Sequence, residues 1–583
     1  EQRERTTQVT EVTKRSYEPT LDDENEEYAG RILRDPDADE DMDANISDMA
    51  SLLEEELRRT MSFDDDSILH HYLSELCETI DEPEPFIGMA PGFDEDWREL
   101  PYKEVLAARL REMQCLRDFS MFIEVDPSTL PTGTKAIPCR FFYRKREKDV
   151  KARVVVQQIK KKYGSYRWVD IFAAAPSSTA HALFAWYALV HGWPVIEGDL
   201  TTAFLHANLE EGMPDIYVQP PTEVDQGKWW KLQKALYGLR ISPRLFQRWL
   251  SGEFKSVGFQ PTRPDPMLFW RESDHALIIA HADNVRITVE PEAAGDLKLQ
   301  LGQRMKIRWE NELGEDWSAY LGSSWKRPGP HEMRVKPEKR HFDQLFKTLA
   351  LTQAKPVSTP NWSPAEERHE GVPLDEQRAT DFRSGVGLLQ WIAHATVRPR
   401  PDLQYTVKEL ARALAHPSER DWSRLRRVAR YCLGSCDAEM VMKPEVAARL
   451  VVLAHGDSSY ADLVDRKSTT GFAIRLQTMV VAMGARTQAV IALSSGEAEL
   501  MAANTTAAEA MFVQHLLQDI GYPDVPIELY TDSSAALGAV HREGAGKLKH
   551  IEVKQLWLQQ AIRRKLLDCK KVGTQENVAD LLT

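Results

Sequence analysis

The sequence predicts a multidomain α+β protein whose last part is an α/β domain. Its 583 residues are too many for one hydrophobic core, and usual domain sizes predict roughly three to four folded units. Two apolar runs, 195–204 and 277–289, each carry an aspartate where a strand is expected to end or turn. From about residue 446 onward, strand-like and helix-like segments alternate, which is typical of an α/β domain.

Charge is distributed unevenly along the chain. The formal net charge is -15, which by itself argues against a nucleic-acid partner. Residues 1–100, however, contain 31 of the 89 acidic and 9 of the 74 basic residues. The remainder is therefore mildly basic, and clustered lysines and arginines there could follow a phosphate backbone.

The N-terminal 90 residues form a separate acidic segment. Runs such as DDENEE and DPDADEDMDA, with few aromatic residues, cannot bury enough apolar surface to offset the entropy of ordering. We expect residues 1–90 to be mostly disordered. No run reaches the roughly 18 apolar residues of a membrane span, and six cysteines lack zinc-site spacing, so we expect free thiols in a cytoplasmic protein without a membrane segment.

A helix and a basic hairpin are expected next. Within 97–121, Val105, Leu106, Leu110 and Met113 recur at helical spacing and predict one packed face. The segment 135–156 predicts a β-hairpin with lysines near its turn. Such a charge run is usually a solvated turn, and a phosphate contact is the alternative.

Two further strand ends carry candidate catalytic carboxylates. The segment 177–193 predicts an amphipathic helix behind a sheet, followed by a strand that ends near Asp199. A second hairpin places Asp283 and Asn284 in its turn. A lone aspartate at such a position is most often a cap or a turn residue, whereas two at one sheet edge could hold divalent cations for phosphoryl transfer.

The motifs around these aspartates resemble a known family. DLTTAFLHANLEE, KLQKALYGLRISPR and the turn at 283 are similar, in order and spacing, to the reverse transcriptase of copia-type LTR retrotransposons. The chain departs from that pattern where HADN replaces the family's Y-V-D-D, so Asn284 stands where a second turn carboxylate is expected. The resemblance implies a right-hand polymerase with fingers and palm at 91–330, a thumb-like segment at 331–362, and a linker with connection helices at 363–445.

The same resemblance implies roles for individual residues. Asp199 and Asp283 would bind catalytic metal ions. Lys151 and Arg153 would contact the triphosphate, and Phe204 would lie under the sugar and exclude a 2′-hydroxyl. Tyr237 and Gly238, in the segment LYGLR, complete the implied nucleotide-binding set.

The C-terminal part, 446–583, carries four acidic residues in a recognisable order. Asp457 and Asp532 end predicted strands, Glu499 follows a helix start with a predicted capping box of Ser494 and Glu497, and Asp580 lies on a final short helix. With the phrases ELMAA, TDSSAA and ENVADLL, these acids resemble the Asp-Glu-Asp-Asp set of ribonuclease H. The resemblance implies that all four bind metal and cleave RNA.

The implied activity is RNA-directed DNA synthesis combined with ribonuclease H cleavage, with two Mg²⁺ or Mn²⁺ ions in each site. The implied partners are an RNA template, a DNA primer, an RNA/DNA hybrid and deoxynucleoside triphosphates; a virus-like particle or nuclear location is compatible with the family. Two alternatives stay open because of Asn284: a degenerate element with a silent polymerase and a working nuclease, and an inert nucleic-acid-binding relic. The sequence leaves the oligomeric state open.

Overall fold

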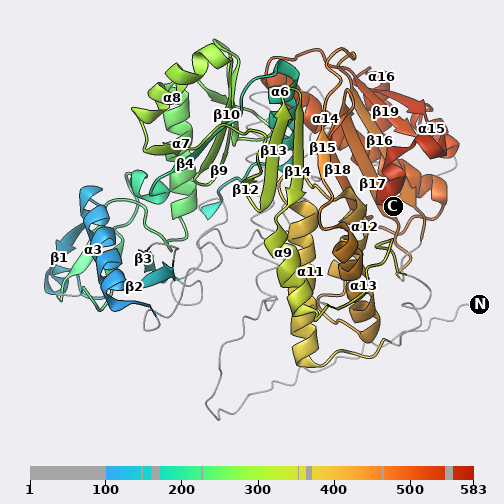
Figure 1. The fold of residues 1–583 in the computed structure, drawn as a ribbon. Helices are drawn as coiled ribbons and strands as arrows, with labels where there is room; N and C mark the ends of the chain where they lie inside the picture. The colour runs from blue at the N-terminus through green and yellow to red at the C-terminus, as the bar shows by residue number, and fades with distance from the viewer. Residues whose placement is uncertain are drawn as a thin grey trace, which may run out of the picture.

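The computed structural model describes residues 100–145, 149–158, 171–224, 227–351, 353–362, 371–461, 465–544 and 556–583. The predicted acidic segment 1–90 lies outside these residues. Over the described ranges the chain combines four β-sheets with helices, as expected for an α+β protein (Figure 1). No helix among the described residues is long and apolar enough to cross a bilayer. The five described cysteines are free thiols.

The first unit packs helix α3 (Tyr102–Asp118) on a five-stranded sheet of order β1-β6-β5-β2-β3. The predicted basic hairpin is confirmed, since β2 and β3 pair antiparallel. The predicted packing face of α3 is partly wrong: Val105 and Met113 are buried, but Leu106 and Leu110 are 43% and 64% exposed. Ala108 and Leu116 complete the buried face instead, because the side of α3 that carries them is the side that packs on the sheet. The strands are β1 (Phe122–Val125), β2 (Ala136–Lys145), β3 (Val150–Val156), β5 (Tyr217–Gln219) and β6 (Trp229–Leu232).

The second unit is a six-stranded sheet of order β11-β4-β10-β9-β8-β7. Strand β10 pairs antiparallel with both β4 and β9, so Asn284 lies opposite Asp199 on one side and His281 on the other. The predicted turn is wrong by one residue: Ala282, with φ of 51°, and Asp283 form the turn, and Asn284 begins β10. The elements are β4 (Ile196–Leu200), β7 (Gln260–Pro261), β8 (Leu268–Arg271), β9 (Ala276–His281), β10 (Asn284–Thr288), β11 (Ile307–Trp309), α7 (Ser242–Ser256) and α8 (Ala294–Gly302).

Helix α6 (Ser178–His191) lies between this sheet and the C-terminal part (Figure 1). The prediction of an amphipathic helix is wrong, because every residue from Thr179 to Leu189 is buried. The helix contacts β9 on one side and β14 and β18 on others, so no face is left for solvent. Ser177 caps its first turn by accepting a hydrogen bond from the amide of Ala180 at 3.0 Å.

A small antiparallel sheet of order β12-β13-β14-β15 lies beside helix α6. Below it, four helices share one hydrophobic core that contains Phe342, Leu345, Phe382 and Leu425. This core joins helices from both sides of the predicted boundary at residue 362. The division into thumb-like and connection segments stays a prediction. The elements are β12 (Ser318–Tyr320), β13 (Ser323–Gly329), β14 (Glu332–Pro337), β15 (Met440–Met442), α9 (Lys339–Thr348), α11 (Glu376–His394), α12 (Gln404–Ala411) and α13 (Glu419–Ser435).

The C-terminal part is a five-stranded mixed sheet of order β18-β17-β16-β19-β20. Its first three strands in sequence pair antiparallel, and β16, β19 and β20 run parallel. Long helix α14 packs across β16, β17 and β19, and the 3-10 helix η8 contacts β16 and β17. The elements are β16 (Val452–Ser459), β17 (Thr469–Leu476), β18 (Met479–Thr487), β19 (Ile527–Thr531), β20 (Asp568–Lys571), α14 (Ser495–Asp519), α15 (Ser534–Val540), α16 (Trp557–Arg563) and η8 (Val578–Leu582).

A buried ion pair ties the six-stranded sheet to the small sheet beside it. Arg286 on β10 donates from Nε to Oε1 of Glu197 on β4 at 2.9 Å, and both side chains are under 10% exposed. The guanidinium carbon of Arg286 also lies 3.4 Å from the centre of the Tyr320 ring on β12. Breaking a buried pair leaves one charge without compensation in a poorly solvated place.

Replacing Glu197 by alanine is therefore expected to lower the free energy of unfolding by about 3–5 kcal/mol, since Arg286 would stay buried without its carboxylate. Chemical denaturation followed by fluorescence measures the change. Glu310→Ala, which breaks the exposed pair with Arg308 at 3.1 Å, serves as the control and should cost less than about 1 kcal/mol. Equal losses in the two variants would contradict the prediction.

Candidate catalytic sites

Asp199 and Asp283 lie side by side at one edge of the six-stranded sheet. Strand register places Asp199 opposite Asn284, and the carbonyl of Asp283 accepts a hydrogen bond from the amide of Leu200 at 2.8 Å. Burial raises the pKa of Asp283, and the neighbouring charge of Asp199 raises it further. A carboxylate pair of this kind suits Mg²⁺, which binds through one or two carboxylates together with substrate phosphates.

Two cations from the first unit face this pair. The charges of Arg153 and Lys151 on β3 lower the pKa of Asp283, opposing the effect of burial, so they lie within electrostatic reach of its carboxyl group. The guanidinium carbon of Arg153 lies 4.2 Å from the centre of the Tyr237 ring. The Tyr237 ring in turn meets the half-buried ring of Phe204 edge to face, with centroids 5.4 Å apart. Lys151, Arg153 and Tyr237 thus lie within electrostatic reach of Asp283, and Phe204 packs against Tyr237.

Gly238 allows this arrangement through its backbone. Its φ is +87°, and a Cβ at this position would lie 2.1 Å from the carbonyl oxygen of Val156. Without a side chain, the loop approaches β3 closely enough for the amide of Val156 to donate to the carbonyl of Tyr237 at 2.7 Å. Gly238 thus permits a close backbone approach, and this approach places Tyr237 beside Arg153.

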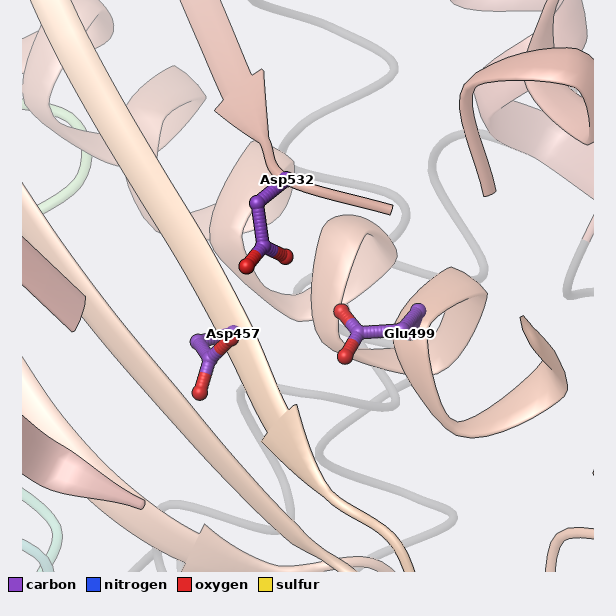
Figure 2. A group of neighbouring side chains, drawn as sticks. All are labelled: Asp457, Glu499 and Asp532. Carbon is purple, nitrogen blue, oxygen red and sulfur yellow. The ribbon is translucent and has the colours of Figure 1, made fainter. Parts of the chain in front are cut away.

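Three acidic side chains converge in the C-terminal part. Asp457 on β16, Glu499 on α14 and Asp532 directly after β19 each offer a carboxylate oxygen, and these oxygens lie within 4.8 Å of one another (Figure 2). Among the described residues, these three acids form the group of possible metal ligands whose oxygens lie close enough together to hold one ion. Asp580, on η8, is exposed and lies outside the group, although its charge contributes to raising the pKa of Asp457.

Two glycines that the sequence analysis did not single out allow close packing around these acids. A Cβ on Gly456 would lie 2.6 Å from Oγ1 of Thr506, so its absence lets α14 pack directly against β16. A Cβ on Gly471 would lie 2.8 Å from the carbonyl oxygen of Ala579, so its absence lets η8 pack on β17. Glycine inside a strand is the sequence signal that could have identified both close approaches.

The start of α14 is fixed by hydrogen bonds that differ slightly from the predicted capping box. Oγ of Ser494 accepts from the amide of Glu497 at 3.2 Å, as expected. The Glu497 carboxylate, however, accepts from the amide of Leu493 at 2.8 Å, one residue before the cap. The helix therefore begins at a defined residue, and Glu499 follows in its first turns.

Side chains near the C-terminus orient Asp457. Nδ2 of Asn577 donates to Oδ1 of Asp457 at 3.4 Å and to the carbonyl of Gly456 at 3.2 Å, and the hydroxyl of Thr583 donates to the other carboxylate oxygen. Asn577 is buried. These partners hold one of the three carboxylates in a fixed orientation, and the sequence analysis missed both.

The three acids fit a divalent cation. Burial, followed by the charge of Asp457, raises the pKa of Glu499 to about 7, and burial together with the charges of Asp532 and Asp580 raises the pKa of Asp457. Oε2 of Glu499 is buried and accepts no hydrogen bond from the described residues. A cation would neutralise the repulsion and supply the missing partner of that oxygen.

Comparisons with known proteins assign a family to part of the chain. Residues 125–363 match the family model "Reverse transcriptase (RNA-dependent DNA polymerase)". The retrovirus-related Pol polyprotein from transposon RE2 of Arabidopsis thaliana is 28% identical over 78% of this chain and 31% of its own length. That from transposon TNT 1-94 of Nicotiana tabacum is 26% identical over 82% of this chain and 36% of its own length.

The chain belongs to the copia-type Pol polyproteins. It spans about a third of the length of the curated copia-type relatives described above. Among solved structures, the foamy viral protease-reverse transcriptase in complex with an RNA/DNA hybrid aligns with a TM-score of 0.47 at 11% identity, over 94% of this copia-type chain and 64% of that one.

The raised pKa of Glu499 predicts a pH-dependent affinity for metal. The proton on Glu499 competes with a cation, so the affinity for Mn²⁺ is expected to rise by about tenfold per pH unit up to about pH 7 and to level off above it. Without metal, the folded state holds this proton more tightly than the unfolded state, so its stability should fall as the pH rises from about 4.5 to about 7.

Calorimetric titration with Mn²⁺ between pH 5.5 and 8.5 measures the first effect. Glu499→Gln, which has no titrating proton, is expected to bind Mn²⁺ more weakly and with a flatter pH profile. A wild-type affinity that does not change with pH over this range would contradict the prediction.

Proposed function

We propose that this copia-type chain is an RNA-directed DNA polymerase with ribonuclease H activity. The observation that carries the proposal is the convergence of Asp199 and Asp283 with the cationic side chains Lys151 and Arg153, inside a region that matches a reverse transcriptase family. Carboxylates for metal ions on one side and cations for phosphates on the other are what nucleotidyl transfer to a primer requires.

In the proposed polymerase site, Arg153 and Lys151 bind the triphosphate of an incoming deoxynucleotide. The fork of a guanidinium matches two phosphate oxygens, and stacking on the Tyr237 ring restricts where Arg153 can point. Phe204, held edge to face against Tyr237 and Phe246, forms the floor under the sugar and leaves no room for a 2′-hydroxyl. The primer 3′ oxygen attacks the α-phosphorus, the α–β bridging bond breaks with its electron pair leaving on pyrophosphate, and the hydroxyl proton passes to water.

Asp199 and Asp283 would hold the divalent cations, Mg²⁺ or Mn²⁺, which supply charge neutralisation for the nucleophile and the leaving group when bound. Asn284 does not add a third negative charge. Its Nδ2 donates to Oδ1 of Asp283 at 3.3 Å, so it orients the carboxylate that remains. We propose that Asn284 makes the polymerase slower but does not silence it.

The C-terminal part is the proposed nuclease. Asp457, Glu499 and Asp532, with Asp580 within electrostatic reach of Asp457, would bind two cations and position water against an RNA phosphodiester. The order β18-β17-β16-β19-β20, with antiparallel pairing on one side of β16 and parallel pairing on the other, supports a ribonuclease H-like domain at 446–583. Recognition of the hybrid would depend on backbone and 2′-hydroxyl contacts.

The proposed partners are an RNA template, a DNA primer, the RNA/DNA hybrid and deoxynucleoside triphosphates. We also propose fingers and palm at 91–330, a thumb-like segment at 331–362 and connection helices at 363–445. A cytoplasmic location, within a virus-like particle or with passage to the nucleus, would give access to element RNA.

Two substitutions should separate the two activities on one labelled RNA/DNA substrate. Asp199→Asn is expected to lower primer extension by at least about 10³-fold and to leave cleavage of the RNA strand near wild type, because it removes a metal ligand from the polymerase site alone. Asp532→Asn is expected to lower cleavage of the RNA strand and to leave primer extension near wild type. Both carboxylates are replaced by an amide of the same shape, so each variant is the control for the other. Loss of both activities in either variant, or cleavage that survives Asp532→Asn, would count against the assignment.

Asn284→Asp is expected to raise the extension rate about 10-fold, since a second carboxylate beside Asp283 strengthens metal binding. The rate of single-nucleotide addition with Mg²⁺ measures this. Asn284→Ala, which removes the hydrogen bond to Asp283 without adding charge, should be slower than wild type. A wild-type chain that shows no extension until Asn284→Asp is introduced would instead identify a silent polymerase.

A further inference from the structure

Two lysines surround a single aromatic ring close to Asp199. Nζ of Lys306 lies 5.0 Å and Nζ of Lys234 lies 5.6 Å from the centre of the Phe119 ring. The imidazole of His206 meets the same ring edge to face at 5.0 Å and stacks on Trp249 at 4.7 Å. We call these five residues the Phe119 cluster.

The Phe119 cluster is built from backbone that the strands hold firmly. The carbonyl of Lys306 accepts from the amide of Thr201 at 2.9 Å, two residues beyond Asp199. Lys234 forms a β-bridge with Asn208. Between Thr201 and Asn208 in the sequence lies the 3-10 helix η3 (Ala203–His206), which carries His206 and also Phe204. The lysines therefore flank the segment that connects Asp199 to the proposed floor of the nucleotide site.

The two ammonium groups have no anionic partner in the part of the chain that the structure describes. Neither Lys234 nor Lys306 forms an ion pair there with a carboxylate, and Lys306 is exposed while Lys234 is half-buried. Burial lowers the pKa of His206, the hydrogen bond to Thr201 opposes this, and the charges of the two lysines lower it further. Nε2 of His206 donates to the carbonyl of Thr201 at 3.2 Å. Two like charges near one ring repel each other, and a bound anion would remove that repulsion.

The Phe119 cluster and the cations of β3 act on one common group. The charges of Lys306 and Arg153 both act on the thiol of Cys115 at the end of α3, so this thiol lies within electrostatic reach of each. A polyanion held by Arg153 could thus extend toward Lys306. Because both ammonium groups lie within 5.6 Å of the centre of one ring, their charge is confined to a short span, which suits a polyphosphate better than the repeating phosphates of a long strand.

We propose that Lys234 and Lys306 form a polyphosphate-binding site that receives the outer phosphates of the incoming nucleotide or the departing pyrophosphate. The proposal rests on the assignment of the polymerase site at Asp199 and Asp283. Phe119 holds both ammonium groups by cation–π contact, and His206 fixes η3 through its hydrogen bond to the carbonyl of Thr201.

Binding of inorganic tripolyphosphate to the full chain, measured by calorimetry without divalent metal, tests the site directly. Lys234→Gln and Lys306→Gln are each expected to weaken binding several-fold, and the double variant by about 10-fold or more. Lys255→Gln, which removes an exposed charge from the last turn of α7, is the matched control and should bind as wild type. Unchanged tripolyphosphate binding in the double variant would overturn the proposal, as would an equal loss in the control.

Steady-state assays distinguish the two sources of polyphosphate. If the site takes the incoming nucleotide, the double variant raises KM for deoxynucleotides with kcat little changed; if it takes the product, the inhibition constant for pyrophosphate rises instead. Weaker binding of an RNA/DNA hybrid with unchanged tripolyphosphate binding would assign the lysines to nucleic acid and overturn the proposal. A chain that binds tripolyphosphate through these lysines but never extends a primer would refute the proposed polymerase and leave this site standing.

Discussion

Mutual repulsion of carboxylates held at close range is the constraint on which the rest of this structure depends. Asp199 and Asp283 meet because β4 and β10 pair in one register, and a shift by one residue would turn one of them to the other face of the sheet. Asp457, Glu499 and Asp532 meet because Gly456 lets a helix lie directly on a strand. In both places burial raises a carboxyl pKa, so the fold maintains a costly arrangement that a cation would relieve.

The two candidate sites belong to one continuous body. Helix α6 is buried on all sides, and its side chains share a hydrophobic core with α14 and the C-terminal sheet. Polar contacts reinforce this interface: Nε1 of Trp186 donates to Oε1 of Gln477 at 3.3 Å, and Arg263 forms an ion pair with Asp519 at the end of α14 at 2.6 Å. A structure packed in this way resists sliding of one site relative to the other, because a packed core has few alternative arrangements.

Local sequence patterns predicted the elements that depend on local rules. The segment 135–156, with lysines near its centre, predicted the hairpin of β2 and β3, and Ser494 predicted the start of α14, since hairpin turns and helix caps are set within a few residues. The same reasoning failed where partners come from far along the chain. Leu106 and Leu110 have helical spacing, yet the sheet covers only the side of α3 that carries Ala108. Helix α6 has no polar face because β9, β14 and β18 all cover it. These strands are far from α6 in the sequence, so no local window of residues could reveal their contacts. For the candidate sites, spacing identified the acids at strand ends, but the glycines and Asn577 that orient them became visible only through contacts of high sequence separation.

The central claim is that the chain holds divalent cations in two separate carboxylate sites. A crystal structure with Mn²⁺, an RNA/DNA hybrid and a non-hydrolysable deoxynucleotide, with anomalous scattering recorded at the manganese edge, tests it most directly. The account predicts manganese peaks between Asp199 and Asp283 and within the group of Asp457, Glu499 and Asp532. Peaks in neither place, or ions bound by other residues while these carboxylates stay protonated or paired with protein groups, would contradict it.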